Sequence, residues 1–585
     1  MKPNVPSTPS ILSRRQWLSS ASTVAAVAGA SFIAAKSLGA ETEKPAASGS
    51  AGARVYDIRD FGAKGDGKTL DTAALQAAID ACNKDQGGTV LVPAGTFLIG
   101  TTELKSNVTL HIAAGGKLLG VADGKQYYAS DKIPLRAETE SERSTLATLG
   151  DGNVGLLFAV NAENVTIEGP GMIDGQGAQF KSPAPGQPSP AGITGAKRPY
   201  HMLFFRCNRV TVRNIFLLNC AFHSVRVVQC RFVYLDGISI KGRVISNNDG
   251  FHFIACEYVH MTNCDVYSQD DACALFGSCR FITITNCTFS TRWSVFRFGG
   301  GVAENIVVSN CILNEVWGCP IKMRCGADSR FENISFSNLV MNNVTGPVSI
   351  GLGAQGRRRP NADASGKANA EENRPALPPG IVRNISFSNI RATVKKPQPL
   401  TDSEHPSGYN PGEVFSCITL NAYDENFLEN ISFSNVHVTF PGGGTAEQAA
   451  VRDVPKVAGE YYQMGVPPSH ALFARNVRGL TLDDVRFELA APDARPAMVF
   501  DHVSDAAVNG LSVQGDKDAE STLRIIESED IYLGATRQLK KVPVFLQVEG
   551  AANANITLDG GDLSKAATPV AFKNGATEKA VTRNR

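Results

Sequence analysis

Residues 230–287 read CRFVYLDGISIKGRVISNNDGFHFIACEYVHMTNCDVYSQDDACALFGSCRFITITNC. Three similar pieces recur in this stretch, CRFVYLDG at 230–237, CEYVHMTNC at 256–264 and CRFITITNC at 279–287. Each piece alternates β-branched or aromatic residues with other residues and ends at Asn, Asp or Gly, which is typical of a short strand that leads into a turn. The stretch therefore predicts a repeated β unit. A helical repeat is the weaker alternative because the pattern has period two.

The same unit recurs on both sides of this stretch. Examples are AENVTIEG at 162–169, CNRVTVRNI at 207–215, FENISFSNL at 331–339 and LENISFSNV at 428–436. The spacing in the middle of the chain is 23–24 residues, as from Cys264 to Cys287 to Cys311, which suits one coil of a parallel β-helix. Such a coil buries its inner face only by stacking on its neighbours, about 4.8 Å apart. Asn263, Asn286 and Asn310 would then form an amide ladder along the turns.

The repeat sets the expected boundaries of the fold. We predict an all-β chain with one parallel β-helix domain over residues 54–565 and a C-terminal tail over 566–585. Residues 69–84, TLDTAALQAAIDACNK, predict a short N-terminal helix with an apolar stripe of Leu75, Ile79 and Cys82. This helix could cap the first coil, whose strand edges would otherwise be open.

The N-terminal segment predicts export. SRRQWLSSASTVAAVAGASFIAA at 13–35 places Arg14 and Arg15 before an Ala-rich apolar run, which is typical of a twin-arginine signal peptide. We predict a signal peptide over residues 1–40, a linker over 41–53, and a mature protein in the periplasm or outside the cell. The alternatives are an N-terminal membrane anchor or a chance Arg pair. No other run approaches the about 20 apolar residues that span a bilayer, so no membrane span is expected in the mature chain.

Charge and cysteine content exclude several classes of function. The formal net charge of +1 gives no reason to expect binding to nucleic acid or to a membrane surface. The 13 cysteines are an odd number, and several recur at the coil spacing, so we expect mostly buried, unpaired thiols. No CxxC pair with matching ligands occurs, so no metal and no cofactor are expected.

Three aspartates stand out among the strands. Asp249 lies in NNDG, and Asp270 and Asp271 lie in QDDA, with 22 residues from Asp249 to Asp271. This spacing is close to one coil and predicts that the three lie together on neighbouring coils. Three close carboxylates raise at least one pKa, and hydrolysis of a glycosidic bond needs one protonated and one ionised carboxyl group. The alternative for Asp249 is turn chemistry, because Asn-Asp-Gly is a common turn.

A second group of side chains has outward parity on the same coils. It comprises Arg226, His252, Trp293, Arg297, Lys322 and Arg324. Cations that flank carboxylates suggest an anionic sugar polymer as substrate, with Trp293 as a platform for a sugar ring. The alternative is that the cations only neutralise the aspartates.

At these residues the chain resembles the family 28 glycoside hydrolases, the polygalacturonase family, within the pectin lyase-like β-helix superfamily. The resemblance also covers FGAKGDGKTLDTAALQAAIDAC at 61–82, GGTVLVPAGTFLIG at 87–100 and NVTIEGPGMIDGQG at 164–177. It implies a right-handed parallel β-helix and hydrolysis of a pectin-like polymer, either galacturonan or rhamnogalacturonan. It further implies that Asp270 is the general acid and that Asp249 and Asp271 activate water, with inversion at the anomeric carbon. We expect a monomer.

Two positions depart from the family pattern. The family has Gly-His-Gly one coil later, where this chain has RWS, with Trp293 in place of the His. The family's Arg-Ile-Lys corresponds to PIK, so that Pro320 replaces the Arg while Lys322 remains. In the family the residues at these positions contact the sugar and its carboxylate. Arg324 or Arg297 could substitute for the missing Arg.

Two other functions stay open from the sequence. In a β-helix polysaccharide lyase, the aspartates would bind calcium, and Arg297 or Lys322 would remove a proton. A non-catalytic carbohydrate-binding β-helix would bind a saccharide without turnover, and Asp270→Asn would leave that binding unaffected.

Overall fold

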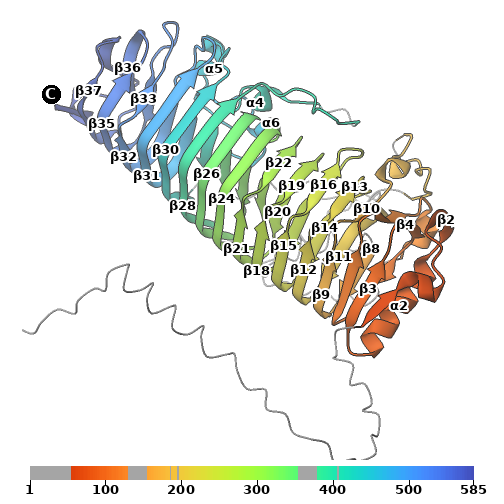
Figure 1. Cartoon of the computed structure of the whole chain (residues 1–585). Helices are drawn as coiled ribbons and strands as arrows, with labels where there is room; N and C mark the ends of the chain where they lie inside the picture. The colour runs from red at the N-terminus through yellow and green to blue at the C-terminus, as the bar shows by residue number, and fades with distance from the viewer. Residues whose placement is uncertain are drawn as a thin grey trace, which may run out of the picture. The chain divides into compact units, whose positions relative to one another are not determined.

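The computed structural model describes residues 54–128, 155–184, 186–193, 197–353, 378–404, 408–423 and 425–584. The predicted signal peptide (1–40) and linker (41–53) lie outside these ranges. The described residues form a right-handed parallel β-helix, in which each turn of the chain adds strands to three parallel ladders. Figure 1 shows the coils following one another from the red and orange strands of the first coils to the blue strands near the C-terminus.

Short strands build the first coils. The first ladder contains β1 (Val55–Asp57), β3 (Gly88–Val92), β6 (Val108–Ile112), β9 (Glu163–Glu168), β12 (Asn208–Arg213), β15 (Arg231–Asp236), β18 (Glu257–Thr262) and β21 (Cys279–Thr285). The second contains β2 (Asp66–Leu70), β4 (Gly95–Ile99), β7 (Gly116–Gly120), β10 (Met172–Asp174), β13 (Phe216–Leu218), β16 (Ser239–Gly242), β19 (Asp265–Ser268) and β22 (Thr288–Thr291). The third, which carries the candidate site, contains β5 (Thr102–Glu103), β8 (Gly155–Val160), β11 (Tyr200–Phe205), β14 (Val225–Val228), β17 (Phe251–Ile254), β20 (Cys273–Phe276), β23 (Phe296–Gly299), β25 (Ile321–Cys325), β27 (Val348–Leu352) and β29 (Ile418–Ala422).

In the later coils the first two ladders run through single long strands. These are β24 (Val302–Val316), β26 (Arg330–Val344), β28 (Ile381–Val394), β30 (Leu428–Phe440) and β31 (Leu472–Leu489). The remaining strands are β32 (Met498–Asn509), β33 (Ser512–Val513), β34 (Leu523–Ile526), β35 (Glu529–Gln538), β36 (Val542–Glu549), β37 (Ala554–Asp562), β38 (Ala566–Lys573) and β39 (Val581–Asn584). The short helices are η1 (Ile58–Phe61), η2 (Gly124–Gln126), η4 (Gly177–Phe180), α4 (Pro411–Val414), α5 (Ala446–Ala449), α6 (Tyr461–Met464) and η6 (Glu578–Ala580).

The predicted C-terminal tail is wrong. Residues 566–584 form β38 and β39, which pair in parallel with β36 and β37 and so extend the stack. The physical reason is a continued period-two pattern, in which Val570 lies beside Leu546 and Phe572 beside Val548 in register. The sequence signal was weak because these strands are largely half-buried or exposed.

The predicted N-terminal helix is α2 (Thr72–Lys84), and its buried residues are Leu75, Ala78, Ile79 and Cys82. It packs against β1, β3 and β5, which belong to the first coils. Within the described residues, no helix is long and apolar enough to cross a membrane.

The core is a column of stacked apolar side chains. Phe387 is completely buried, and its ring stacks on Phe336 at 5.3 Å and on Phe433 at 4.7 Å, with interplanar angles of 7° and 15°. The 13 cysteines are all buried, as expected, and no disulfide joins them in the described residues. Stacking identical residues from coil to coil thus builds the core from a short sequence repeat.

An amide ladder follows one line of turns. Asn310, Asn338, Asn389 and Asn435 all have left-handed backbone conformations, with φ between 53° and 55°. Each amide donates to the previous one, with distances of 3.0, 3.0 and 2.9 Å. The ladder begins at Asn310 and not at the predicted Asn263, because the Asn263 amide donates to Asp236 and the Asn310 amide donates to the hydroxyl of Thr285.

Replacement of Phe387 by Ala should lower the free energy of unfolding by about 3–5 kcal/mol, because it leaves a cavity between two stacked rings. The matched control is Val340→Ala on the outer face of β26, where the side chain is 50% exposed and a change within about 0.5 kcal/mol is expected. Urea unfolding followed by circular dichroism measures both. Equal effects of the two substitutions would contradict the stacked core.

Candidate active site

Asp249 and Asp271 occupy equivalent places on neighbouring coils. Each lies two residues before a strand of the third ladder, β17 or β20, and Phe251 pairs with Cys273 in the register of those strands. The ladder extends back to the aspartates, because the Gly250 N–H donates to the Asp271 carbonyl at 2.9 Å. Both carboxylates are more than nine-tenths buried. The two aspartates are therefore aligned on neighbouring coils, as predicted.

Asp270 is held by its neighbours. Its Oδ1 accepts from the Asp271 backbone N–H at 2.9 Å, and its Oδ2 accepts from Asn247 Nδ2 at 3.3 Å. Its carbonyl accepts from the hydroxyls of Ser268 and Thr291 at 2.7 and 2.5 Å. The turn therefore orients the carboxyl group.

Burial raises the pKa values of all three carboxyl groups, and repulsion between them raises the pKa values of Asp249 and Asp271 further. Burial, followed by the charges of Asp270 and Asp271, raises the pKa of Asp249 well above its ordinary value. Burial, followed by the charge of Asp270, raises the pKa of Asp271 to about 6, against the lowering effect of Arg297 and Lys322. Burial also raises the pKa of Asp270, and the Asp271 N–H partly offsets it. The cluster therefore retains protons at a pH where exposed aspartates are ionised.

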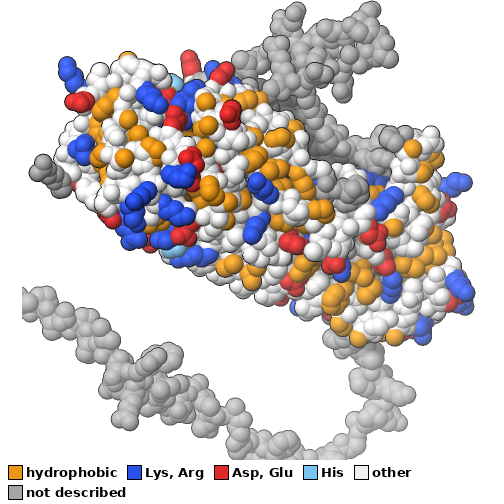
Figure 2. Space-filling model, turned by 90° about the horizontal axis from the view of Figure 1, so that it is seen from above, with side chains coloured by type: hydrophobic (Ala, Val, Ile, Leu, Met, Phe, Trp, Pro, Cys, Tyr) orange, Lys and Arg blue, Asp and Glu red, His pale blue; other side chains and the backbone are white. Residues whose placement is uncertain are grey.

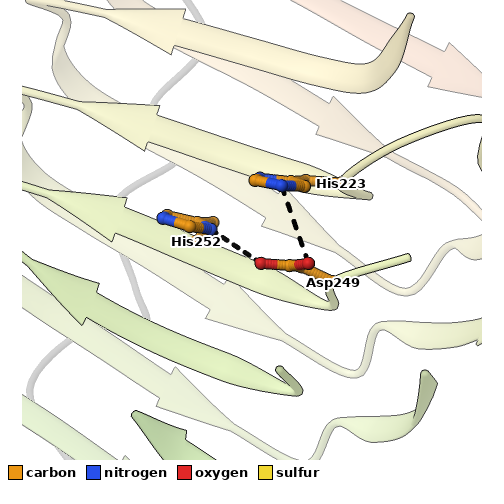
Figure 3. A group of neighbouring side chains, drawn as sticks. All are labelled: His223, Asp249 and His252. Carbon is orange, nitrogen blue, oxygen red and sulfur yellow. Dashed lines mark hydrogen bonds and ion pairs between the residues drawn. The ribbon is translucent and has the colours of Figure 1, made fainter. Parts of the chain in front are cut away.

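Two histidines contact Asp249 (Figure 3). His252 Nδ1 lies 2.8 Å from Asp249 Oδ2, and His223 Nε2 lies 3.6 Å from Oδ1. The two rings are parallel, with centroids 4.5 Å apart and an interplanar angle of 7°. His223 stands one coil before Asp249, since Val225 pairs with Phe251. Sequence reasoning missed His223, although this equivalence of position was a signal for it.

Arg226 fixes the orientation of His223. Its Nη1 donates to Tyr200 Oη at 2.9 Å and lies 3.0 Å from His223 Nδ1. Since a guanidinium only donates, Nδ1 accepts and the His223 proton is on Nε2, facing Asp249. Burial lowers the pKa of both His223 and His252 well below 6.5, so both rings are neutral.

His223, Asp249 and His252 also have the spacing of a metal-binding group, with one ligand atom from each within 4.8 Å of the others. A divalent cation there would meet the guanidinium of Arg226, which already contacts His223. The repulsion disfavours an ion, and each ring has a hydrogen-bonding role without one.

Arg297 and Lys322 stand in register on β23 and β25, with Arg324 two residues further along β25. All three approach Glu460, the residue that caps the N-terminus of α6. Lys322 Nζ lies 2.5 Å from Glu460 Oε2, Arg297 Nη2 lies 3.9 Å from Oε1, and Arg324 Nη2 contacts the same Oε1. The cations predicted to meet a substrate are thus paired within the chain, by a residue that the sequence analysis did not identify.

Trp293 lies between two cations. Lys322 Nζ is 4.3 Å and the Arg292 guanidinium carbon 4.5 Å from the centre of its ring. Arg292 also lies 3.6 Å from Glu413 of α4. The ring is therefore close to the aspartates but partly covered by these cations.

The structure brings the predicted side chains of Asp270, Asp271 and His252 close to Asp249, and those of Arg297 and Lys322 close to Asp271. The ring of Trp293 lies against Lys322. Arg226 is buried and contacts His223 and Tyr200, and Arg324 is paired with Glu460.

The sequence model described as "Glycosyl hydrolases family 28" matches residues 82–401, more than half of the chain. The chain belongs to glycoside hydrolase family 28. A "Probable polygalacturonase" from Vitis vinifera is 31% identical over 228 residues, which is 38% of this chain and 44% of that relative. A "Polygalacturonase" from Malus domestica is 25% identical over 360 residues, 59% of this chain and 70% of the relative.

Solved structures share the fold of this family 28 chain. The family 28 exopolygalacturonase of Yersinia enterocolitica superposes with a TM-score of 0.53 at 19% identity, over 79% of each chain. The exopolygalacturonase of Thermotoga maritima gives 0.50 at 19% identity, over 74% of this chain and 92% of that one. At these identities the likeness shows the right-handed parallel β-helix alone.

Replacement of Asp271 by Asn should stabilise this family 28 protein at pH 8. The folded-state pKa of about 6 exceeds the ordinary 3.8, so the stability that this carboxyl contributes is greatest below pH 4 and is lost as pH rises through about 6. Above that, an ionised Asp271 costs up to about 3 kcal/mol, which the amide avoids.

Thermal unfolding at pH 8 and pH 4 measures this difference. The gain of Asp271→Asn should vanish at pH 4, and the exposed control Asp265→Asn should change stability by less than about 0.5 kcal/mol at either pH. A loss of stability at pH 8 would contradict the raised pKa.

Proposed function

We propose that this protein is an exported polysaccharide hydrolase that cleaves glycosidic bonds of a pectin-like anionic polymer, galacturonan or rhamnogalacturonan. The observation that carries the proposal is the cluster of the buried Asp249 and Asp271 with the half-buried Asp270, whose pKa values are all raised. A water-activating base and a protonated acid are what glycoside hydrolysis needs. Membership of family 28 supports the reaction class.

The three carboxyl groups have different roles in the proposed reaction. Asp270 is the general acid, a role that its position in QDDA implies by resemblance to family 28, and burial raises its pKa, which helps it to keep a proton for the leaving oxygen. Asp249 and Asp271 share the activation of water, and direct attack of that water inverts the anomeric carbon. His223 and His252 hold the carboxylate of Asp249 in place through its two oxygens.

The polymer is expected to carry charge because cations surround the aspartates. Arg297 and Lys322 lower the pKa of Asp271, and Arg198 and Arg226 act in the same sense on Asp249. The names of the relatives, which are polygalacturonases, agree with a uronate polymer. Acidic and basic side chains lie side by side over the face in Figure 2, so recognition is local rather than through a field of one sign.

One observation favours a lyase as the second candidate. Burial lowers the pKa of Lys322 well below its ordinary value, which is what a lysine base needs. Its ion pair with Glu460 opposes this role, because the carboxylate stabilises the charged amine. Elimination leaves an unsaturated sugar that absorbs ultraviolet light, and hydrolysis does not.

Export is the remaining part of the proposal. Arg14 and Arg15 stand before an apolar run in residues 1–40. The 13 buried cysteines, which form no disulfide in the described residues, suit a chain that folds before it leaves a reducing compartment. The twin-arginine route carries folded proteins.

Asp270→Asn should reduce the release of reducing ends from pectic polysaccharides by about 10²–10⁴-fold, because the amide cannot donate the proton. The assay compares reducing ends with ultraviolet absorbance on galacturonan, esterified pectin and rhamnogalacturonan. Asp265→Asn is the matched control, since its exposed carboxylate lies on β19, and it should keep full activity.

Full activity of Asp270→Asn would contradict the role of Asp270 as the general acid. A lyase releases one reducing end and one absorbing, unsaturated sugar at each cut. Absorbance that rises in proportion to the reducing ends would therefore establish the lyase. Binding without turnover in the unsubstituted protein would leave a carbohydrate-binding β-helix.

Changing Arg14 and Arg15 to Lys should abolish export, because the route reads the arginine pair. Cell fractionation with an antibody measures the share of protein outside the cytoplasm. The control changes Lys36 to Arg, beyond the apolar run, and should leave export unchanged. Export of the double Lys variant at the normal level would contradict the twin-arginine route.

A further inference from the structure

Glu460 brings a carboxylate of the protein itself into the candidate site. It lies 138 residues after Lys322 in the chain, in the segment 441–471 that connects β30 to β31. Its side chain is only 8% exposed and meets Lys322, Arg297 and Arg324. A sugar carboxylate bound beside Asp271 would use these same cations.

The segment around Glu460 is fixed in place by polar contacts. The hydroxyl of Tyr461, the next residue, is buried and donates to the Cys417 carbonyl at 2.7 Å. Gln463 accepts from the Glu460 backbone N–H at 3.0 Å and closes a capping box on α6. Gly412 of α4 packs so tightly on Tyr461 that a Cβ there would lie 2.1 Å from its carbonyl oxygen.

The rest of the connection is anchored as well. Arg475 donates to the carbonyls of Val454 and Pro455 at 2.7 and 3.0 Å. Arg452 pairs with Glu549 of β36 at 2.8 Å. Contacts at both ends make the Glu460 carboxylate a permanent part of the site rather than the tip of a loop that leaves it.

The cations beside the aspartates already have carboxylate partners within the chain. Arg297, Lys322 and Arg324 face the carboxyl groups of Glu460, Asp270 and Asp271. A further carboxylate would meet Glu460 at close range, and like charges brought together in an interface cost several kcal/mol. An uncharged group would meet no such penalty.

We propose that Glu460 occupies the place of a substrate carboxylate, so that the sugar bound beside Asp270 and Asp271 is uncharged. It is either a neutral sugar that alternates with uronates in the polymer or a uronate whose carboxyl group is esterified. This inference rests on the proposed function, because it names the substrate class of the same site. Other positions along the polymer remain free to carry charge.

The test compares trigalacturonate with its trimethyl ester, in which three methyl groups remove the three charges. Calorimetry measures their affinities for the full chain carrying Asp270→Asn, which prevents turnover. The second protein carries Glu460→Gln in addition. The amide keeps the size of the side chain and removes the charge.

The ester should bind more tightly than the acid when Glu460 is present. Glu460→Gln should raise the affinity for the acid relative to the ester by at least about tenfold, since about 1.4 kcal/mol of removed repulsion has that effect. Glu460→Asp, which keeps the charge, should keep the preference for the ester. Glu447→Gln on α5, an exposed carboxylate of the same segment, should also keep it.

Tighter binding of the acid than of the ester with Glu460 present would overturn the inference, as would an unchanged ratio in a folded Glu460→Gln protein. Absence of binding by both ligands to every variant would overturn it too. Circular dichroism establishes that each variant is folded.

Failure of the proposed function gives a different pattern. If the unsubstituted protein hydrolyses no pectic polymer while the affinity ratio still shifts, the hydrolase assignment fails and the role of Glu460 stands. If hydrolysis proceeds but the ratio does not shift, the hydrolase stands and the role of Glu460 fails.

Discussion

Parallel hydrogen bonding in register between successive coils is the constraint on which the rest of the structure depends. Once Phe251 pairs with Cys273, each residue of β17 has a fixed neighbour on β20. The same register stacks Phe336, Phe387 and Phe433 in the core and sets Asp249 beside Asp271 at the turn before their strands. The same register therefore gives both the stacked core that stabilises the fold and the alignment of the two aspartates.

The register also concentrates charge at one place on the stack. Asp249 and Asp271 are buried, so their ionisation is costly and their pKa values rise. The cations on β23 and β25 lower that cost without removing it, because Glu460 draws on the same positive charge. The result is a set of carboxyl groups whose pKa values lie above that of an exposed aspartate.

The sequence was sufficient to predict the features that follow from its repeat. Period two and the coil spacing predicted the parallel β-helix, the buried cysteines and the alignment of the aspartates. Glu460 could not be predicted, because it reaches Lys322 across 138 residues through a connection that breaks the repeat. Residues 566–584 were missed for a related reason, since strands β38 and β39 at the end of the stack bury little of their surface.

The most direct test of the account is the configuration of the first sugar end released, followed by nuclear magnetic resonance before mutarotation. Aligned aspartates that activate water for direct attack predict inversion, so an α-linked pectic polymer should release the β-anomer first. Initial release of the α-anomer would mean that a carboxylate attacks the sugar itself, and it would contradict the roles given to Asp249 and Asp271.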